Sequence, residues 1–201
     1  MQPPEIDFHL ASGSPRRREL LSALGYRFAV IAAPVEERPA PGEGAAHYVQ
    51  RVALDKARAG RASLAGTDTR PVLAADTEVE IDGEVLGKPG SLGELLGMLG
   101  RLSDRSHRVL SAVALCQGAS ERVLLSTTLV TLRPLAEAEI RAYWASGEPQ
   151  DKAGGYAIQG LGAEFVSRIE GSYTGVVGLP LCETAMLLRE HGIEGWRRTP
   201  T

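Results

Sequence analysis

Residues 107–116 and 121–132 are two long, mostly apolar runs, and only a short segment containing Gly118 separates them. Two such runs joined by a short glycine-containing loop predict a pair of antiparallel strands. A second hairpin is predicted where Asp82-Gly83 interrupts the extended residues 71–86, because Asp-Gly is typical of two-residue hairpin turns. These hairpins are incompatible with a purely parallel sheet.

The other elements mix helices with strands. Residues 6–11 predict a short buried strand that passes through Ser12-Gly13-Ser14-Pro15 into a helix over 16–24. Ser14 suits the N-cap, Pro15 suits the first helical position, and Gly25 suits the C-terminal cap. Further strands are predicted over 26–32 and 163–169, and further helices over 43–62, 92–102, 134–146 and 179–191. The fold class is therefore mixed α/β, as one domain over residues 6–192 with short tails over 1–5 and 193–201.

Composition restricts the kinds of partner. The chain has 22 Lys and Arg residues against 25 Asp and Glu residues, a net charge of -3, so it has no overall basic field for nucleic acid. No segment has the length and hydropathy of a membrane span, and the N-terminus lacks the pattern of a signal peptide. Cys116 and Cys182 lack the spacing of a metal or redox motif, so both are predicted to be reduced core residues. We therefore expect a cytoplasmic protein that binds neither nucleic acid nor membranes.

The triplet Arg16-Arg17-Arg18 lies at the start of a predicted helix, where the helix dipole already carries partial positive charge. A strand, a glycine-containing turn and a helix N-terminus together form a typical phosphate site, and arginine matches phosphate oxygens with forked donors. The sequence thus predicts phosphate binding by Arg16 and Arg17, with Ser12 and Ser14 in the same turn. The alternative is a solvated basic face, and Arg18 fits that alternative.

Asp76 ends an apolar run, and Thr77 follows it directly. In mixed sheets, strand ends of this kind face ligand clefts, although an aspartate there can also simply cap a turn. Lys88, after the Asp82-Gly83 hairpin, and Lys56, on the helix over 43–62, are candidate cations for the same cleft. Each could equally be a solvated lysine.

Carboxylates near this cleft are candidate metal ligands. Glu36 and Glu37 lie in an acidic, proline-containing loop, and with Asp76 they offer the oxygen ligands that Mg²⁺ prefers. The four histidines share no ligand spacing, which argues against a zinc site and against histidine-dependent nucleophilic catalysis.

Four motifs, in order, resemble the Maf family of nucleotide pyrophosphatases over about residues 8–190. They are LASGSPRRRELL at 10–21, ADT at 75–77 with GKP at 87–89, DKAGGYAIQG at 151–160, and FVSRIEGSY at 165–173 followed by VGLPL at 177–181. The resemblance implies an elongated α/β fold similar to inosine triphosphate pyrophosphatase, with two lobes about a central cleft. It also implies a divalent cation, Mg²⁺ first and Mn²⁺ as the alternative, a homodimer, and release of pyrophosphate from a nucleoside triphosphate.

The resemblance also implies roles for individual residues. Asp76 matches the proton acceptor, and Arg16, Thr77 and Gln159 match positions that distinguish substrate branches. In the branch that takes 7-methylguanosine triphosphate, these three positions hold Trp, Gln and Glu. A Trp face suits a cationic methylated purine, whereas Gln159 offers both donors and an acceptor to uracil or thymine. The chain thus resembles the dTTP/UTP branch.

Small departures from the family pattern leave questions open. Glu78 stands where the family usually has an apolar residue, and Gly155 and Ala157 exchange a common Ala and Gly, which bears on the preference between dTTP and UTP. Two other functions remain as alternatives: a non-catalytic nucleotide-binding regulator of septum formation, and a 7-methyl-GTP pyrophosphatase.

Overall fold

A twisted, seven-stranded mixed sheet runs through the computed structural model, which describes residues 5–196. The strand order is β2-β1-β3-β5-β6-β7, and β4 pairs with β3. The strands are β1 Phe8–Ala11, β2 Phe28–Ile31, β3 Val72–Ile81, β4 Glu84–Leu86, β5 Ser106–Gln117, β6 Ser120–Leu132 and β7 Val166–Glu170. The helices are α1 Pro15–Ala23, α2 Ala45–Ser63, α3 Leu92–Leu102, α4 Glu137–Ala145, α5 Tyr173–Val177 and α6 Leu181–Glu190. The predicted α/β class is confirmed.

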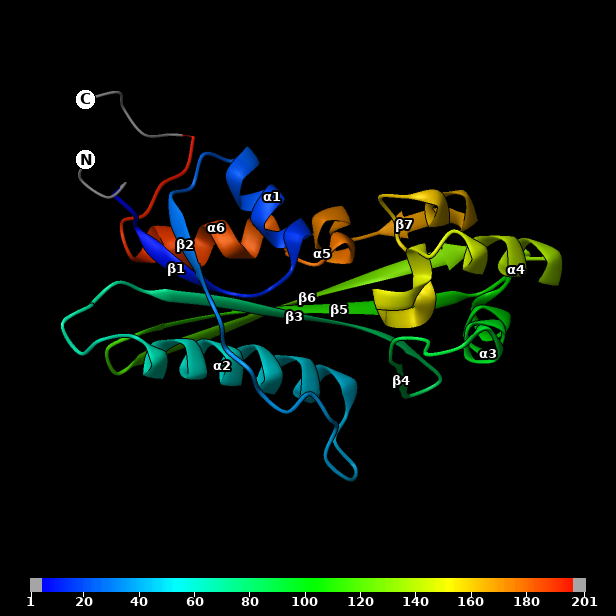
Figure 1. Cartoon of the computed structure of the whole chain (residues 1–201), viewed down its shortest axis with the longest axis horizontal. Helices are drawn as coiled ribbons and strands as arrows, with labels where there is room; N and C mark the ends of the chain where they lie inside the picture. Colours follow the sequence, from blue (N-terminus) through cyan, green and yellow to red (C-terminus); the bar gives the residue numbers. More distant parts are fainter. Residues whose placement is uncertain (1–4, 197–201) are drawn as a thin grey trace.

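Both predicted hairpins are present. Strands β5 and β6 pair antiparallel along nearly their whole length, and β3 pairs antiparallel with β4 across the Asp82-Gly83 turn. Strand β1 pairs parallel with both β2 and β3, which makes the sheet mixed. The long strands β3, β5 and β6 form the axis of an elongated molecule (Figure 1).

Helices cover both faces of the sheet around β1 and the first half of β3. Helix α2 covers one face, and α1 and α6 lie against the other (Figure 1). Because side chains alternate along a strand, Leu73 and Ala75 pack in the core with α1 and α6, while Val72 and Ala74 pack in the core with α2. A side chain at Gly60 of α2 would come within 2.9 Å of Val72. This helix therefore approaches the sheet closely only because residue 60 is glycine.

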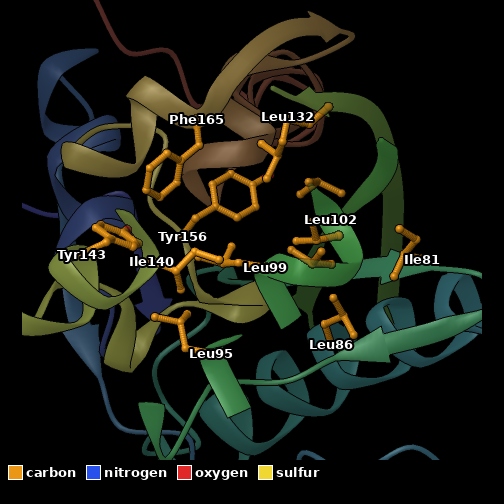
Figure 2. Packing of buried hydrophobic residues seen from close by; sticks show 13 residues of the cluster. Ile81, Leu86, Leu95, Leu99, Leu102, Leu132, Ile140, Tyr143, Tyr156 and Phe165 are labelled. Carbon is orange, nitrogen blue, oxygen red and sulfur yellow. The ribbon is translucent and has the colours of Figure 1, made fainter. Parts of the chain in front are cut away.

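The other end of the sheet carries a second lobe. Its core joins the far ends of β3, β5 and β6 to α3 and α4 and includes Leu95, Leu99, Ile140 and Tyr156 (Figure 2). The chain from Glu148 to Phe165 covers this core mainly as short 3-10 turns, at Glu148–Asp151, Ala153–Gly155 and Leu161–Phe165. No helix within residues 5–196 is long and apolar enough to cross a membrane.

The structure corrects three details of the sequence analysis. The strand predicted over 163–169 is β7, which begins only at Val166 because a 3-10 turn occupies the preceding residues. Cys182 is exposed at the start of α6 rather than in the core, whereas Cys116 is buried as predicted. Ile193, assigned to the C-terminal tail, is buried because the left-handed turn at Gly192 folds it back onto the core of α6 and β1. The predicted tails otherwise fall largely on residues 1–4 and 197–201, outside the described residues.

Candidate active site

A cleft of about 700 Å³ lies between the two lobes. The first lobe contributes the turn over residues 11–17, part of the loop after β2, and Lys56 of α2. Strand β3 contributes residues 76–79 at the base, and the second lobe contributes Lys88 and residues 151–159 apart from Gly154 and Gly155. The resemblance predicted two lobes about a central cleft, and the structure has this arrangement.

The arginine turn forms one wall of the cleft. Ser14 is the N-cap residue of α1 and Pro15 its first residue, as predicted, although the Ser14 hydroxyl makes no capping hydrogen bond. The buried Ser12 hydroxyl instead accepts hydrogen bonds from the Ser14 amide, at 3.2 Å, and from Nη1 of Arg17, at 3.1 Å. Arg18 is exposed and outside the cleft lining. The turn thus directs Arg16 and Arg17, but not Arg18, into the cleft.

Gly178 connects this wall to the base of the cleft. Its carbonyl oxygen accepts hydrogen bonds from Nε of Arg17, at 2.8 Å, and from the Thr77 hydroxyl, at 3.3 Å. The backbone of Gly178 has a φ of 129°, a region that side-chain-bearing residues rarely adopt. Burial lowers the pKa of Arg17, while the charges of Asp76 and Glu37 oppose that shift. Arg17 is therefore fixed in place before any ligand binds.

Asp76 faces the other way from Thr77, toward α2, because successive residues of β3 point to opposite faces of the sheet. The Lys56 ammonium lies 2.8 Å from Oδ1 of Asp76 and 3.0 Å from Oε1 of Glu37. The second oxygen of Asp76, Oδ2, is buried and has no hydrogen-bond partner among the residues described. One lysine thus joins the two carboxylates and leaves the buried Oδ2 of Asp76 without a hydrogen-bond partner in the part of the chain that the structure describes.

Glu78 follows two residues later in β3 and lines the same cleft. Burial, with added repulsion from Asp76 and Glu37, raises the pKa of Glu78 to about 8. The sequence left the effect of Glu78 open. The structure places it in the acidic cleft.

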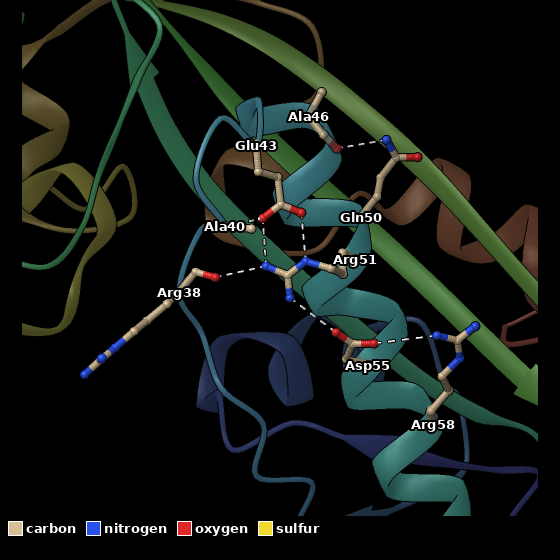
Figure 3. Close-up of polar contacts among 8 residues, drawn as sticks. All are labelled: Arg38, Ala40, Glu43, Ala46, Gln50, Arg51, Asp55 and Arg58. Carbon is tan, nitrogen blue, oxygen red and sulfur yellow. Dashed lines mark hydrogen bonds and ion pairs between the residues drawn. The ribbon is translucent and has the colours of Figure 1, made fainter.

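The loop that carries Glu37 is tied to α2. Arg51 donates hydrogen bonds to both carboxylate oxygens of Glu43, at 2.7 and 2.8 Å, and to the carbonyl of Arg38, at 2.9 Å (Figure 3). This pairing lowers the pKa of Glu43 to about 2. Glu36 and Glu37 are both exposed, but only Glu37 is among the residues that line the cleft. Of the two candidate ligands in this loop, the structure brings only Glu37 to Asp76.

The second lobe supplies the opposite wall. Lys88 and Gln159 are exposed and line the cleft. Within residues 5–196, neither side chain makes a hydrogen bond or ion pair, so both are available to a ligand. Arg16 reaches across from the first lobe, with its Nη2 3.9 Å from a carboxylate oxygen of Asp151.

The cleft also contains residues that the sequence analysis did not select. Gly178 orients Arg17 and Thr77 through its carbonyl, and the motif VGLPL, in which it lies, was the only sequence indication of its importance. Tyr48 and Tyr156 line the cleft as well, but both resemble ordinary core tyrosines in the sequence.

The residues present fit a divalent cation that is held jointly with a ligand. In the described part of the chain, no group of three or more His, Cys, Asp or Glu residues is placed to bind a metal by itself. The Lys56 ammonium contacts one carboxylate oxygen of Asp76 and one of Glu37. Oδ2 of Asp76 has no hydrogen-bond partner among the described residues. Mg²⁺ commonly takes one or two carboxylates together with water and substrate phosphates. Asp76 and Glu37 match that pattern.

Comparison with known proteins identifies the family. A family model described as Maf-like protein matches residues 7–191. The chain belongs to the Maf family. It is 54% identical over 193 residues to a dTTP/UTP pyrophosphatase of Methylococcus capsulatus, an alignment that covers 96% of this chain and 95% of that protein. It is 49% identical to a dTTP/UTP pyrophosphatase of Hahella chejuensis, with 93% of each chain covered.

These two Maf relatives match the chain almost from end to end, so the predicted family resemblance is confirmed. Among solved structures, the Ham1 protein of Staphylococcus aureus aligns over 62% of this chain and 71% of its own, with 18% identity and a TM-score of 0.44. That similarity is too distant to support a conclusion about the chain.

Proposed function

We propose that this Maf protein hydrolyses dTTP and UTP to the monophosphate and pyrophosphate. The observation that carries the proposal is the pairing of Asp76 and Glu37 through Lys56 in a cleft whose other wall is the arginine turn. In such a cleft, the Asp76 and Glu37 carboxylates can hold a metal ion and activate a water molecule. The positively charged arginine side chains on the facing wall can bind the phosphates. The names of the two relatives, both dTTP/UTP pyrophosphatases, agree with this proposal.

In this proposal the phosphates lie between the arginine turn and Lys88. Arg16, Arg17, Lys56 and Lys88 neutralise their charge, and the hydroxyls of Ser12 and Ser14 belong to the same phosphate site. Because Arg17 is already fixed by Ser12 and Gly178, it needs little reorganisation when charge develops on the leaving pyrophosphate. A preorganised donor of this kind typically contributes a factor of about 10² to 10³ in rate.

Asp76 acts as the proton acceptor in the proposed reaction. A water molecule attacks the α-phosphorus and its proton passes to the Asp76 carboxylate, while the bond from the α-phosphorus to the bridging oxygen breaks and pyrophosphate leaves. Lys56 holds one oxygen of Asp76, which leaves Oδ2 as the accepting atom. The family resemblance likewise assigns the proton acceptor to the position of Asp76.

Asp76 and Glu37 would also hold the divalent cation, Mg²⁺ in the first instance and Mn²⁺ as the alternative. When bound there, such a cation would add to the charge neutralisation of the phosphate oxygens. Because Lys56 contacts both carboxylates, it keeps them together before the cation and the nucleotide arrive. We exclude Glu36 from this set, since it does not line the cleft.

Arg16, Thr77 and Gln159 are the proposed specificity residues. Gln159 is exposed in the cleft wall, and its amide can accept from the N3–H of a pyrimidine and donate to a neighbouring carbonyl. Thr77 acts from the base of the cleft, where its hydroxyl contacts Gly178. The location in the cytoplasm and the homodimer remain predictions.

A panel of triphosphates tests the proposal. The purified protein is incubated with Mg²⁺ and dTTP, UTP, dCTP, GTP or 7-methyl-GTP, and monophosphate, pyrophosphate and inorganic phosphate are quantified separately. We expect equimolar monophosphate and pyrophosphate, fastest with dTTP and UTP. Saturable binding without turnover would instead favour a non-catalytic regulator. A preference for 7-methyl-GTP would favour the branch of the family that takes 7-methylguanosine triphosphate. Release of inorganic phosphate would overturn the proposed bond cleavage.

A further inference from the structure

Gln159 lies on a loop whose backbone is held by two side chains from outside the loop. The amide of Ala157 donates to the Tyr143 hydroxyl at 3.1 Å. The amides of Leu161 and Gly162 donate to the two carboxylate oxygens of Glu148, at 2.9 and 3.0 Å. The attachments therefore flank Gln159 on both sides along the chain.

The two side chains are bonded to each other as well. The hydroxyl of Tyr143 donates to Oε1 of Glu148 at 2.8 Å, so one phenol both donates to the carboxylate and accepts from the loop. Tyr143 is buried at the end of α4, where its ring meets that of Phe165 edge to face with centroids 5.0 Å apart. Burial alone would raise the pKa of Glu148, but the hydrogen bonds from Gly162 and Leu161 lower it, so the carboxylate stays ionised. The Tyr143–Glu148 pair is thus rigid and charged.

Packing shows how closely the loop lies on this pair. A Cβ atom at Gly162 would come within 2.7 Å of the Tyr143 hydroxyl oxygen, and one at Gly160 would overlap the Glu148 carboxylate. Neither position has room for a side chain without displacement of the pair. The loop backbone therefore lies directly against Tyr143 and Glu148 while the Gln159 side chain is exposed in the cleft wall.

A free amide on a mobile loop discriminates poorly between bases, because the ordering cost on binding offsets the hydrogen bonds gained. The Tyr143–Glu148 pair fixes the backbone on both sides of Gln159. Most of the conformational entropy of the loop is therefore already lost on folding, before a ligand binds. We propose that Tyr143 and Glu148 are positioning residues for base recognition, which hold the Gln159 loop in the geometry that reads the pyrimidine. This inference rests on the proposed function, because it deepens the role of the same site.

Three variants and one matched control test this inference. Glu148→Ala removes the acceptor for two loop amides, and Glu148→Gln keeps one acceptor oxygen. Tyr143→Phe removes the acceptor for Ala157 and the donor to Glu148. Glu164→Ala is the control, an exposed glutamate of the same region that does not line the cleft. We expect Glu148→Ala to raise the KM for dTTP roughly ten- to hundredfold with little change in kcat, as expected when charged hydrogen bonds that hold a binding loop are lost. Glu148→Gln and Tyr143→Phe should have smaller effects, and the control none.

A base-free inhibitor separates positioning from general damage. Inorganic tripolyphosphate should bind the phosphate site without contact to Gln159, so its inhibition constant should stay unchanged in Glu148→Ala. A variant that is merely unstable would lose both affinities in parallel. A parallel loss in both Glu148→Gln and Tyr143→Phe would overturn the inference.

A double-mutant cycle with Gln159→Ala tests the route of the effect. If Glu148 acts through Gln159, the rise in KM should largely disappear when Gln159 is already alanine, whereas independent effects would multiply and refute the inference. Hydrogen exchange gives a readout without turnover: the amides of Ala157, Leu161 and Gly162 should exchange faster in Glu148→Ala. If the wild type releases no pyrophosphate, the proposed function fails, while unchanged exchange at these amides would overturn the positioning role itself.

Discussion

Lys56 and Asp76 form an ion pair of 2.8 Å in which both side chains are nearly enclosed, at 11% and 5% exposure. An enclosed charge is tolerated only when it is paired or hydrogen-bonded. Asp76 satisfies this condition with one oxygen, and Lys56 shares its charge further with Glu37. The pair therefore holds the Asp76 carboxylate in place at the base of the cleft, where a proton acceptor is required.

Asp76→Asn should lower kcat for dTTP by at least about 10²-fold, since the amide cannot accept the proton and carries no charge for a cation. Lys56 keeps Glu37 as a partner, so the variant should remain folded by circular dichroism and thermal unfolding. Asp55→Asn, on the same helix as Lys56 but outside the cleft lining, serves as the control and should retain normal kcat. Near-normal pyrophosphate release by the Asp76 variant would remove Asp76 as the base.

Gln159→Glu should lower kcat/KM for dTTP and UTP by roughly ten- to hundredfold, because a carboxylate has no donor for a pyrimidine carbonyl and repels it. Steady-state kinetics with the same triphosphate panel measures the change. Gln150→Glu, also exposed and outside the cleft lining, adds the same charge and should leave the kinetics unaltered. Equal losses in both variants would show that net charge, and not base recognition, is responsible.

The hairpins and the arginine turn could be predicted from sequence because their determinants are local. Asp82-Gly83 sets a turn, and Ser14, Pro15 and Gly25 mark the ends of one helix. The contact between Lys56 and Asp76 was not predictable from spacing, since it depends on how α2 crosses β3 at Gly60. Gln159, in contrast, was selected only through the motif match.

Other parts of the site lay beyond sequence reasoning for the same reason. Glu36 and Glu37 are adjacent acidic residues in one loop, and only the folded loop, tied by Arg51 and Glu43, distinguishes them. The exposure of Cys182 depends on which side of α6 meets the sheet, which a short amphipathic run did not specify.

Gly178→Ala should destabilise the protein by about 1–2 kcal/mol, because a φ of 129° is strained for any residue with a Cβ atom. It should also lower kcat/KM for dTTP by about tenfold, since the carbonyl that holds Arg17 and Thr77 would shift. Urea unfolding and steady-state kinetics measure the two effects. Gly97→Ala provides the opposite case: Gly97 lies inside α3 with open space around it, and alanine there should stabilise by up to about 1 kcal/mol.

His107 gives a prediction for pH. It is 2% exposed, its Nε2 lies 2.7 Å from the Tyr156 hydroxyl, and its Nδ1 has no hydrogen-bond partner within the described residues. Burial lowers the pKa of His107 to about 4, below the value of about 6.5 for an unfolded histidine. Between these two values the unfolded chain binds a proton that the folded chain does not. The contribution to stability is therefore complete above about pH 6.5 and is lost as the pH falls toward 4.

The full loss amounts to on the order of 3 kcal/mol. Because the raised pKa of Glu78 acts in the opposite direction over this range, the His107 decline is read as the difference between the wild type and His107→Gln, which has no imidazole to protonate. Urea unfolding of both proteins at intervals from pH 7.5 to 4.5 should show that this difference in unfolding free energy changes as the pH falls. His47→Gln, an exposed histidine of α2, should retain the wild-type slope. Carboxylates with strongly lowered pKa values, such as Glu43 and Glu139 at about 2, add their losses only below about pH 4.5. A wild-type slope that persists in His107→Gln would therefore assign the decline to another group.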